Sequence, residues 1–220
     1  MQNTPSWPDD VAASIDYSLL ARASVTRADI QLCCESAIKL KLHGVVVPGS
    51  QVMLATALLE ESEIKIITPV GYPFGLNDTD VKRYETEVAV DNGAHHVELY
   101  ANLGWLKQSE DDKLLREFRD VVEAADDRPV GLAIASNSIP ILEKERLCQM
   151  AQDATIKYIV IGNAIDPAEP ISPGEVKDWR AICPAKIGLK VNARLKDVEL
   201  AQQLIDSGAT WIGISDAIPS

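Results

Sequence analysis

The sequence predicts one (β/α)8 barrel (a TIM barrel) over residues 1–220, and three observations support this fold class. Segments with strand and helix character alternate along the whole chain. The strand-like segments recur at intervals of roughly 20–30 residues, which matches the repeat of such a barrel. They also read as continuous apolar runs, as strands buried on both faces do. The competing layout is an open doubly wound sheet, but no Gly-x-Gly-x-x-Gly sequence follows a strand, so its dinucleotide-binding form has little support.

The strands of the barrel are predicted where short apolar runs, many of them β-branched, stand between turn or helix signals. In chain order they cover residues 15–20, 43–48, 64–70, 96–101, 129–135, 156–161, 186–191 and 211–215. The turn signal is clear after the second strand, where Pro48 and Gly49 follow a β-branched run. These runs account for the eight strands that a closed barrel needs.

The helices are predicted between the strands from capping residues and apolar periodicity. They cover residues 26–40 with Thr26 as N-cap, 50–61, 77 or 79 to 92, 109–125 with Ser109 as N-cap, 143–154, a helix opening at 172–173, and 195–206. No domain boundary, linker or low-complexity stretch interrupts this pattern. The chain stops at Ser220, soon after the eighth strand, so the final helix is expected to be truncated or absent.

Composition restricts the function classes. The formal net charge is −12, which argues against nucleic acid or an anionic membrane as a partner, because both require a basic face. No apolar run approaches the ~20 residues of a membrane helix, and the polar N-terminus lacks the features of a secretory signal. The cysteines Cys33, Cys34, Cys148 and Cys183 form no Cys-x-x-Cys pair, so they are interpreted as reduced packing residues of a cytoplasmic protein.

Lys190 is the first candidate functional residue. It stands inside an apolar strand, where a lysine without a partner costs several kcal/mol. Side chains alternate along a strand, so Glu98 on the fourth strand, which shares one parity with Tyr100 and Asn102, is the expected partner across the barrel core. Two other interpretations stay open: a lysine that reaches water at the strand end, and a buried ion pair without a catalytic role.

A metal site or a nucleophilic triad has little support from the sequence. His95 and His96 are adjacent on a strand and face opposite ways, while His43 is remote from both. No Ser-His-Asp or Cys-His spacing is present. The expectation is therefore that the protein uses no metal and no cofactor.

Several sequence segments together resemble a known family. They are Ile-Asp-Tyr-Ser-Leu-Leu at 15–20, Gly-Tyr-Pro-Phe-Gly at 71–75 followed by Val81, Lys82 and Glu85, Gly-Ala at 93–94, Val-Glu-Leu-Tyr-Ala-Asn at 97–102, Gly-Leu-Lys at 188–190, and the run 207–215. In this order and spacing they are similar to the deoxyribose-phosphate aldolases, which are class I aldolases built on a (β/α)8 barrel. The resemblance covers nearly the whole chain.

The resemblance implies roles for residues at matching positions. In the family, a lysine on strand six forms a Schiff base with the sugar carbonyl, a lysine on strand seven lowers its pKa, and an aspartate on strand four joins the proton relay. Lys190 matches the strand-seven lysine, Glu98 the aspartate, and Asn102 a family asparagine, so these three are the predicted catalytic residues. The predicted substrate-binding residues are Asp16, Tyr100, Asn192, Arg194, Gly213 and Ser215.

The departures from the family pattern concern the nucleophile and the phosphate site. The Schiff-base position is Val160, and the nearby Lys157 has the opposite parity. The strand-two cysteine appears as Val46, and a strand-five glutamate appears as Ala135. A Gly-Gly pair that holds the substrate phosphate is replaced by the sequence Asn-Ala-Arg at 192–194.

Three functional hypotheses follow. Lys190 itself could form the Schiff base, with Glu98 and Tyr100 handling protons. The barrel could instead have lost aldolase chemistry and bind a small carbonyl or phosphorylated metabolite or a protein partner, with Arg194 either gripping an anion or standing exposed at a helix start. A different lyase or isomerase acting on a small carbonyl compound is the third hypothesis. The oligomeric state stays open, with a homo-oligomer as one alternative.

Overall fold

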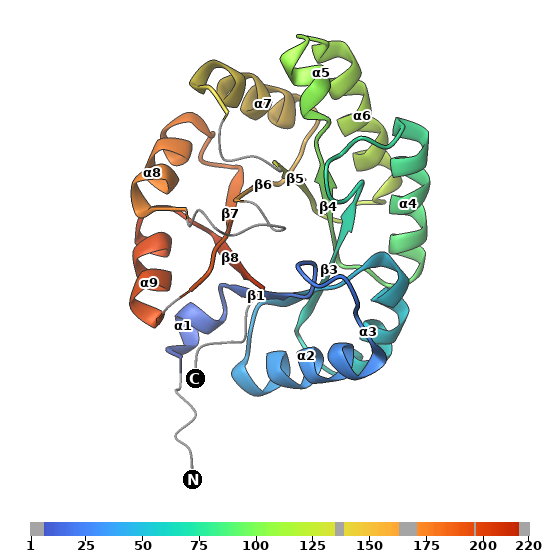
Figure 1. Cartoon of the computed structure of the whole chain (residues 1–220), viewed down its shortest axis with the longest axis vertical. Coiled ribbons are helices and arrows are strands. Elements are labelled where there is room, and N and C mark those ends of the chain that lie inside the picture. The colour runs from blue at the N-terminus through green and yellow to red at the C-terminus, as the bar shows by residue number, and fades with distance from the viewer. Residues whose placement is uncertain (1–6, 135–138, 163–170, 196, 216–220) are drawn as a thin grey trace.

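The chain forms a closed barrel of eight parallel strands in the order β1 to β8 (Figure 1), which confirms the predicted fold class. A computed structural model describes residues 7–134, 139–162, 171–195 and 197–215. The strands are β1 (Ile15–Ser18), β2 (Gly44–Val46), β3 (Lys65–Val70), β4 (His96–Tyr100), β5 (Val130–Ala133), β6 (Tyr158–Ile161), β7 (Gly188–Asn192) and β8 (Trp211–Ile214). Strand β8 pairs with β1 and so closes the barrel.

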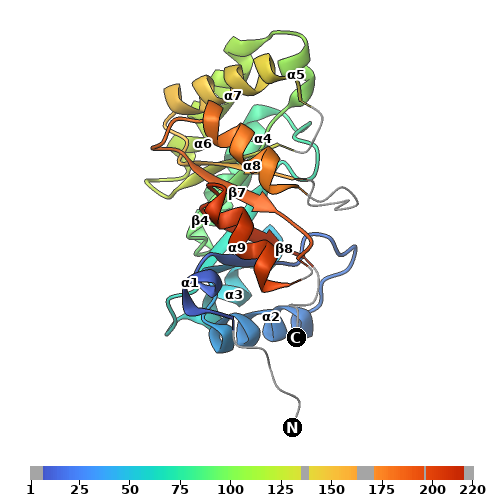
Figure 2. The same ribbon diagram turned by 90° about the vertical axis from the view of Figure 1, so that its left-hand side faces the viewer.

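The helices lie outside the strands and form the outer layer (Figures 1 and 2). They are α1 (Asp9–Ala12), α2 (Arg27–Leu40), the 3-10 turn η1 (Gly49–Gln51), α3 (Val52–Leu59), α4 (Thr79–Asp91), α5 (Leu103–Lys107), α6 (Asp111–Ala124), α7 (Ile141–Asp153), α8 (Pro173–Ile182) and α9 (Val198–Asp206). None of the helices that the structure describes is long and apolar enough to cross a membrane.

Because side chains alternate along a strand, each strand contributes to two apolar regions, one outside the barrel and one inside it. Residues such as Val97 and Leu189 face outward and join the large apolar core against the helices. Inward-facing residues form separate small clusters, of which one contains Tyr100, Tyr158 and Val160. Burial on both faces explains why the strands read as continuous apolar runs.

Capping residues define several helix ends. Thr26 caps α2 as predicted and forms a reciprocal capping box with Asp29, which satisfies backbone N–H groups that have no helical partner. The N-cap of α4 is Asp78, so the predicted caps Asn77 and Thr79 were each wrong by one residue. This stretch offers several good capping residues in succession, and sequence alone does not decide between them.

Two further expectations differ from the structure. The residue before α6 is Glu110 rather than the predicted cap Ser109, because Ser109 has a positive φ of 57° instead of the extended backbone of an N-cap. The short helices α1 and α5 were not predicted. Ala135, which stands where the family has a glutamate, lies outside the described residues, and so does the chain after Ser215. The predicted end of strand five at residue 135 and the expected loss of a final helix therefore stay predictions.

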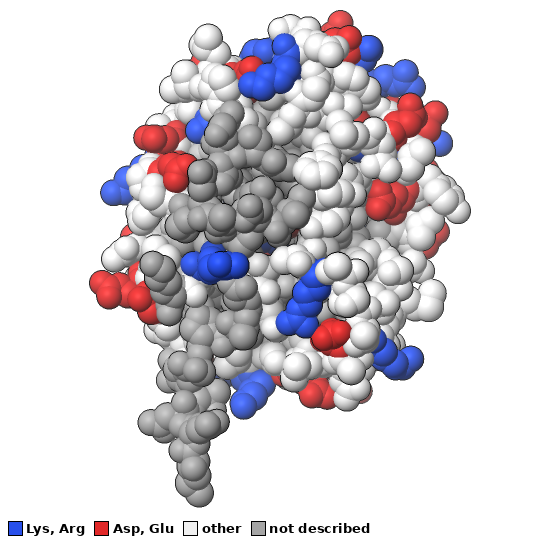
Figure 3. All heavy atoms as spheres, viewed as in Figure 1, with Lys and Arg blue, Asp and Glu red and all other residues white. Residues whose placement is uncertain are grey.

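Surface charge does not gather on one side of the face seen in Figure 1. Acidic and basic side chains alternate around the rim of that face (Figure 3). Ion pairs such as Arg83–Glu87 on α4 and Arg116–Asp120 on α6 join opposite charges at the helix surfaces. The net charge of −12 is therefore consistent with solvated helical surfaces.

Candidate active site

Lys190 lies in the barrel interior between two carboxylates. Its Nζ is 2.6 Å from Glu98 Oε1 and 2.7 Å from Asp16 Oδ2. All three side chains are at most 2% exposed. The ion pair with Glu98 is the one predicted from strand parity, whereas the second ion pair, with Asp16, was not predicted.

Strand geometry brings these three residues together. Lys190 is the middle residue of β7, and its backbone pairs in register with Val160 of β6. Glu98 projects inward from β4 and Asp16 from β1. Because β1, β4 and β7 are distributed around a closed barrel, their inward side chains meet near its axis.

The two carboxylates keep Lys190 charged. Burial alone lowers the pKa of a lysine, but the Asp16 and Glu98 charges outweigh burial here and raise the pKa of Lys190. Burial also raises the pKa of Asp16, yet the Lys190 ammonium and a hydrogen bond with His43 prevail and hold it at about 2. For Glu98 burial prevails over the attraction of Lys190, and its pKa is raised.

Asp16 connects this ion cluster to His43. Its second oxygen, Oδ1, is 2.7 Å from His43 Nδ1. The His43 ring stacks on Trp211 at a centroid distance of 5.1 Å and meets His96 edge-on at 5.9 Å. Burial lowers the pKa of His96 to about 4, and the nearby His43 charge adds to this effect.

An aromatic layer therefore lies on the N-terminal side of the ion cluster. Tyr158 completes it, with its ring 5.2 Å from Trp211 and 5.9 Å from His96. The Tyr158 hydroxyl is buried and has no hydrogen-bond partner among the residues that the structure describes. Gly131 makes room for this ring, since a Cβ at Gly131 would overlap it. The layer fills the barrel beneath Lys190 and separates it from the end where the strands begin.

On the other side of Lys190 the interior is mostly apolar. Val160 packs with Tyr100 and Ala133, and Tyr72 lies against this cluster. Tyr72 and Tyr100 meet edge-on at a centroid distance of 5.2 Å, and the Tyr72 hydroxyl donates to the Leu20 carbonyl at 2.7 Å. Tyr100, a predicted substrate-binding residue, is thus part of an apolar wall toward the C-terminal ends of the strands.

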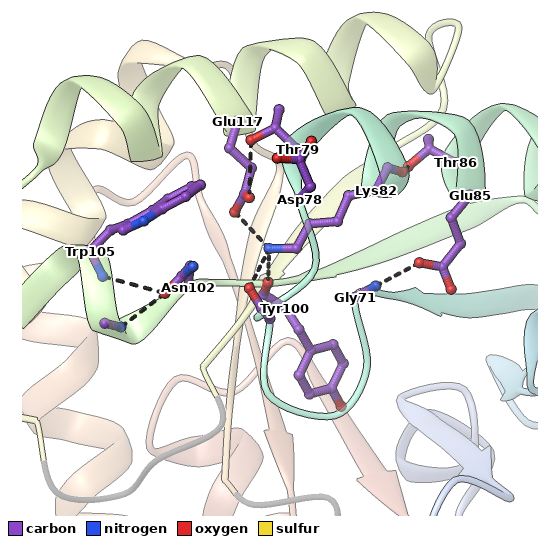
Figure 4. A network of polar contacts seen from close by, with 12 residues as sticks. Gly71, Asp78, Thr79, Lys82, Glu85, Thr86, Tyr100, Asn102, Trp105 and Glu117 are labelled. Carbon is purple, nitrogen blue, oxygen red and sulfur yellow. Dashed lines mark hydrogen bonds and ion pairs between the residues drawn. The ribbon is translucent and has the colours of Figure 1, made fainter.

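A second buried ion pair anchors the segment that carries Tyr72. Lys82 of α4 lies 2.9 Å from Glu117 of α6, and both side chains are fully buried (Figure 4). The Lys82 ammonium also donates to the carbonyls of Gly75 and Tyr100, at 2.7 and 3.0 Å. In Figure 4 the Tyr100 ring points away from Lys82. The family-like segment 71–85 therefore holds the β3–α4 connection in place.

Asn102, a predicted catalytic residue, occupies the N-cap of α5. Its side-chain oxygen accepts from the backbone N–H groups of Gly104 and Trp105, at 3.0 and 3.3 Å (Figure 4). The Asn102 backbone also lowers the pKa of the nearby Glu117 carboxyl, although burial prevails and raises that pKa overall. The structure thus gives Asn102 a structural role at the end of β4.

The remaining predicted substrate-binding residues lie where β7 and β8 end. Asn192 pairs in register with Gly213, and a Cβ at Gly213 would collide with the Asn192 side-chain oxygen. Ser215 follows β8 and is half-buried, while Arg194 follows β7 and is exposed. Asn192 and Gly213 therefore border the Lys190 cluster, whereas Arg194 lies at the surface.

Sequence reasoning missed the parts of this site that depend on barrel closure. His43, His96, Trp211 and Tyr158 come from four different strands or their approaches, and no local pattern indicates that they meet. The inward parity of β1 and the position of Asp16 on it could have suggested Asp16 as a second partner of Lys190. Among the described residues, no group of three or more His, Cys, Asp or Glu side chains could hold a metal ion.

Comparisons with known proteins place the chain among aldolases. The deoxyribose-phosphate aldolase of Geobacillus sp. (strain WCH70) is 32% identical over 211 residues, which is 96% of this chain and 94% of that protein. The enzyme of the same name from Natranaerobius thermophilus is 31% identical over 214 residues, which cover 96% and 95% of the two chains. No protein-family model matches the chain.

Solved structures share the fold at lower identity. An aldolase called QR15 has a TM-score of 0.87 at 23% identity and covers 94% of this chain and 91% of its own. A deoxyribose phosphate aldolase from Aeropyrum pernix, described as tetrameric, has a TM-score of 0.82 at 18% identity, with 93% and 86% covered. From the sequence identity over nearly its full length, the chain belongs to the deoxyribose-phosphate aldolase family.

Proposed function

We propose that this barrel binds a small carbonyl or phosphorylated metabolite without forming a Schiff base on Lys190. The observation that carries the proposal is the contact of the Lys190 ammonium with two carboxylates at 2.6 and 2.7 Å. A Schiff base forms from the neutral amine, which a lysine reaches near neutral pH when burial or a neighbouring cation lowers its pKa. Here the neighbours are anions, and the pKa is raised.

The position beside Lys190 supports the same conclusion. Val160 is in register with Lys190 on the adjacent strand, and its side chain is buried among Tyr100, Ala133 and Tyr158. Among the described residues, the lysine that is buried besides Lys190 is Lys82, which is bound to Glu117 outside the barrel interior. Among the residues that the structure describes, the interior thus holds no second lysine whose ammonium would activate the Lys190 amine.

Family membership supports the class of ligand. The relatives are named for an aldolase of a phosphorylated sugar, and a barrel binds its ligand where the strands end. Asn192 and Ser215 supply hydrogen-bonding groups at this end, while Tyr72 and Tyr100 supply apolar surface. In this account the Lys190 cluster is a fixed charge beneath the ligand.

Aldol or retro-aldol chemistry with Lys190 as nucleophile is the second candidate. It is favoured by the complete burial of Lys190, which is the largest influence on its pKa and acts to lower it. A ligand that displaced Asp16 or Glu98 from the ammonium would leave burial as the dominant effect. In that case the amine would become reactive.

Borohydride trapping separates the two candidates. The protein is incubated with deoxyribose 5-phosphate or with a panel of small aldehydes and ketones, reduced, and analysed by intact mass and peptide mapping. We expect no adduct on Lys190 under conditions in which the Geobacillus relative reacts. An adduct mapped to Lys190, absent in Lys190→Met, would establish the second candidate and refute the first.

A homo-oligomer and a cytoplasmic location stay predictions. The tetrameric description of the Aeropyrum pernix aldolase supports assembly of this chain into a homo-oligomer. Light scattering on the purified chain would measure its mass in solution directly. A monomer at micromolar concentration would contradict the assembly.

A further inference from the structure

Two buried cysteines from different helices lie in contact. Cys148 is in α7, and Cys183 follows the last residue of α8. Their sulfur atoms are 2.8 Å apart although the residues are 35 positions apart in sequence. The two helices are neighbours in the outer layer (Figure 1). Strand β6, which carries Val160, lies between them in the sequence.

The distance between the Cys148 and Cys183 sulfurs is close to that of a disulfide bond. The sulfurs have to approach by less than 1 Å, from 2.8 Å to the roughly 2.0 Å of a disulfide bond. Cys33 and Cys34 are equally buried, but they follow each other on α2, and the Cys33 thiol contacts the Tyr17 carbonyl at 3.8 Å.

The surroundings make the two thiols unequal. The contact with the Cys148 sulfur lowers the pKa of Cys183. Arg180 adds positive charge beside them, since its guanidinium donates to the carbonyls of Cys183 and Pro184 at 2.9 and 2.7 Å. The thiolate is the reactive form of cysteine, so Cys183 is the sulfur that attacks first.

We propose that Cys148 and Cys183 are a modification site that forms a reversible disulfide with a low-molecular-weight disulfide, such as oxidised glutathione, as oxidant. The Cys183 thiolate attacks one glutathione sulfur, and the S–S bond breaks to release one glutathione thiolate. Cys148 then attacks the Cys183 sulfur of the mixed disulfide and releases the second glutathione. Two protein thiols are oxidised, one glutathione disulfide is reduced to two thiols, and the protons pass to the released glutathione.

The test measures thiols after equilibration with the oxidant. The reduced, denatured full-length chain is refolded in excess oxidised glutathione, so that burial does not block access to the thiols. Free thiols are then alkylated in denaturant, and the chain is weighed and mapped. We expect two of the four cysteines to escape alkylation, a mass loss of two hydrogen atoms, and one peptide pair joining Cys148 to Cys183.

Matched variants identify the pair. Cys183→Ser should abolish the cross-link, whereas Cys33→Ser, which removes an equally buried thiol, should keep it. Four free thiols, glutathione adducts in place of the cross-link, or a cross-link that involves Cys33 or Cys34 would each overturn the proposal.

Thermal unfolding gives a second readout. The cross-link closes a loop that includes β6 and α8, and closing such a loop restricts the unfolded chain. The oxidised protein should therefore unfold roughly 5–10 °C above the reduced protein. Cys183→Ser should show no difference between oxidising and reducing buffer, and a lower Tm for the oxidised wild-type protein would contradict a native cross-link.

Discussion

Asp16 and Lys190 form a 2.7 Å ion pair between β1 and β7, with both side chains 1% exposed. Together with Glu98 at 2.6 Å, this pair surrounds one buried ammonium with two carboxylates. A buried cation with two anionic partners is well stabilised as a cation. Lys190 is therefore better suited to neutralise the two buried carboxylates than to attack a carbonyl carbon.

Asp16→Asn should weaken the pH dependence of the free energy of unfolding in acid. The folded-state pKa of Asp16 is about 2, below its ordinary 3.8, so between these values the unfolded chain binds more protons. The ion pair therefore adds about 2 kcal/mol to the free energy of unfolding above pH 3.8. This stabilisation is lost as the pH falls toward 2. Urea unfolding across this range should show the loss in wild type and not in Asp16→Asn. An equal change of unfolding free energy with pH in both proteins would contradict the ion pair. Asp9→Asn removes an exposed partner of Lys41 and serves as the surface control.

His96 should destabilise the fold in mild acid. Its pKa in the folded protein is about 4 instead of 6.5, so the neutral ring is the form that the aromatic layer accepts. The free energy of unfolding is unaffected by this ring above pH 6.5. It falls by up to about 3 kcal/mol as the pH drops from 6.5 to 4, because the unfolded chain binds the proton more tightly. His96→Phe, which keeps an aromatic ring beside Tyr158, should remove this pH dependence from urea unfolding. Proton NMR of the ring measures the pKa itself, and a midpoint near 6.5 would show that the ring is not buried as described.

Asn102 should contribute to stability as a helix cap. Asn102→Ala leaves the N–H groups of Gly104 and Trp105 without their acceptor and should cost about 1 kcal/mol. Asn102→Asp keeps an acceptor oxygen and should retain most of the stability. Urea unfolding of the two variants makes the comparison, and equal stabilities of Asn102→Ala and wild type would rule out the cap.

Val160→Lys should create a reactive amine, which is not found in the described part of the wild-type interior. A lysine at residue 160 would stand in register beside Lys190, and the neighbouring ammonium together with burial should lower its pKa. Borohydride trapping with a small aldehyde should then give an adduct on residue 160. Val160→Met, which is of similar length and uncharged, is the matched control for folding and should give none. A folded Val160→Lys protein that forms no adduct would mean that the interior does not admit a carbonyl compound.

The sequence predicted the barrel and half of its charged core. Regular spacing and two-faced burial make eight parallel strands recognisable, and strand alternation led from Lys190 to Glu98. Asp16 was predicted at the site from family resemblance, but its contact with Lys190 depends on the closure between β1 and β8, which no local pattern encodes. The contact between Cys148 and Cys183 likewise depends on how two separate helices pack. A catalytic role for Asn102 was predicted from the family resemblance and stays a prediction, and its capping contacts become visible in three dimensions.

The most direct test of the account is the charge state of Lys190 itself. Carbon NMR of lysine labelled at Cε follows protonation of each amine, and Lys190→Met identifies the signal. We expect the Lys190 signal to remain that of an ammonium up to at least its ordinary pKa of 10.5, both alone and with deoxyribose 5-phosphate. A titration near neutral pH, or conversion of the signal to that of an imine with a carbonyl compound, would contradict a fixed ammonium and make Lys190 the nucleophile.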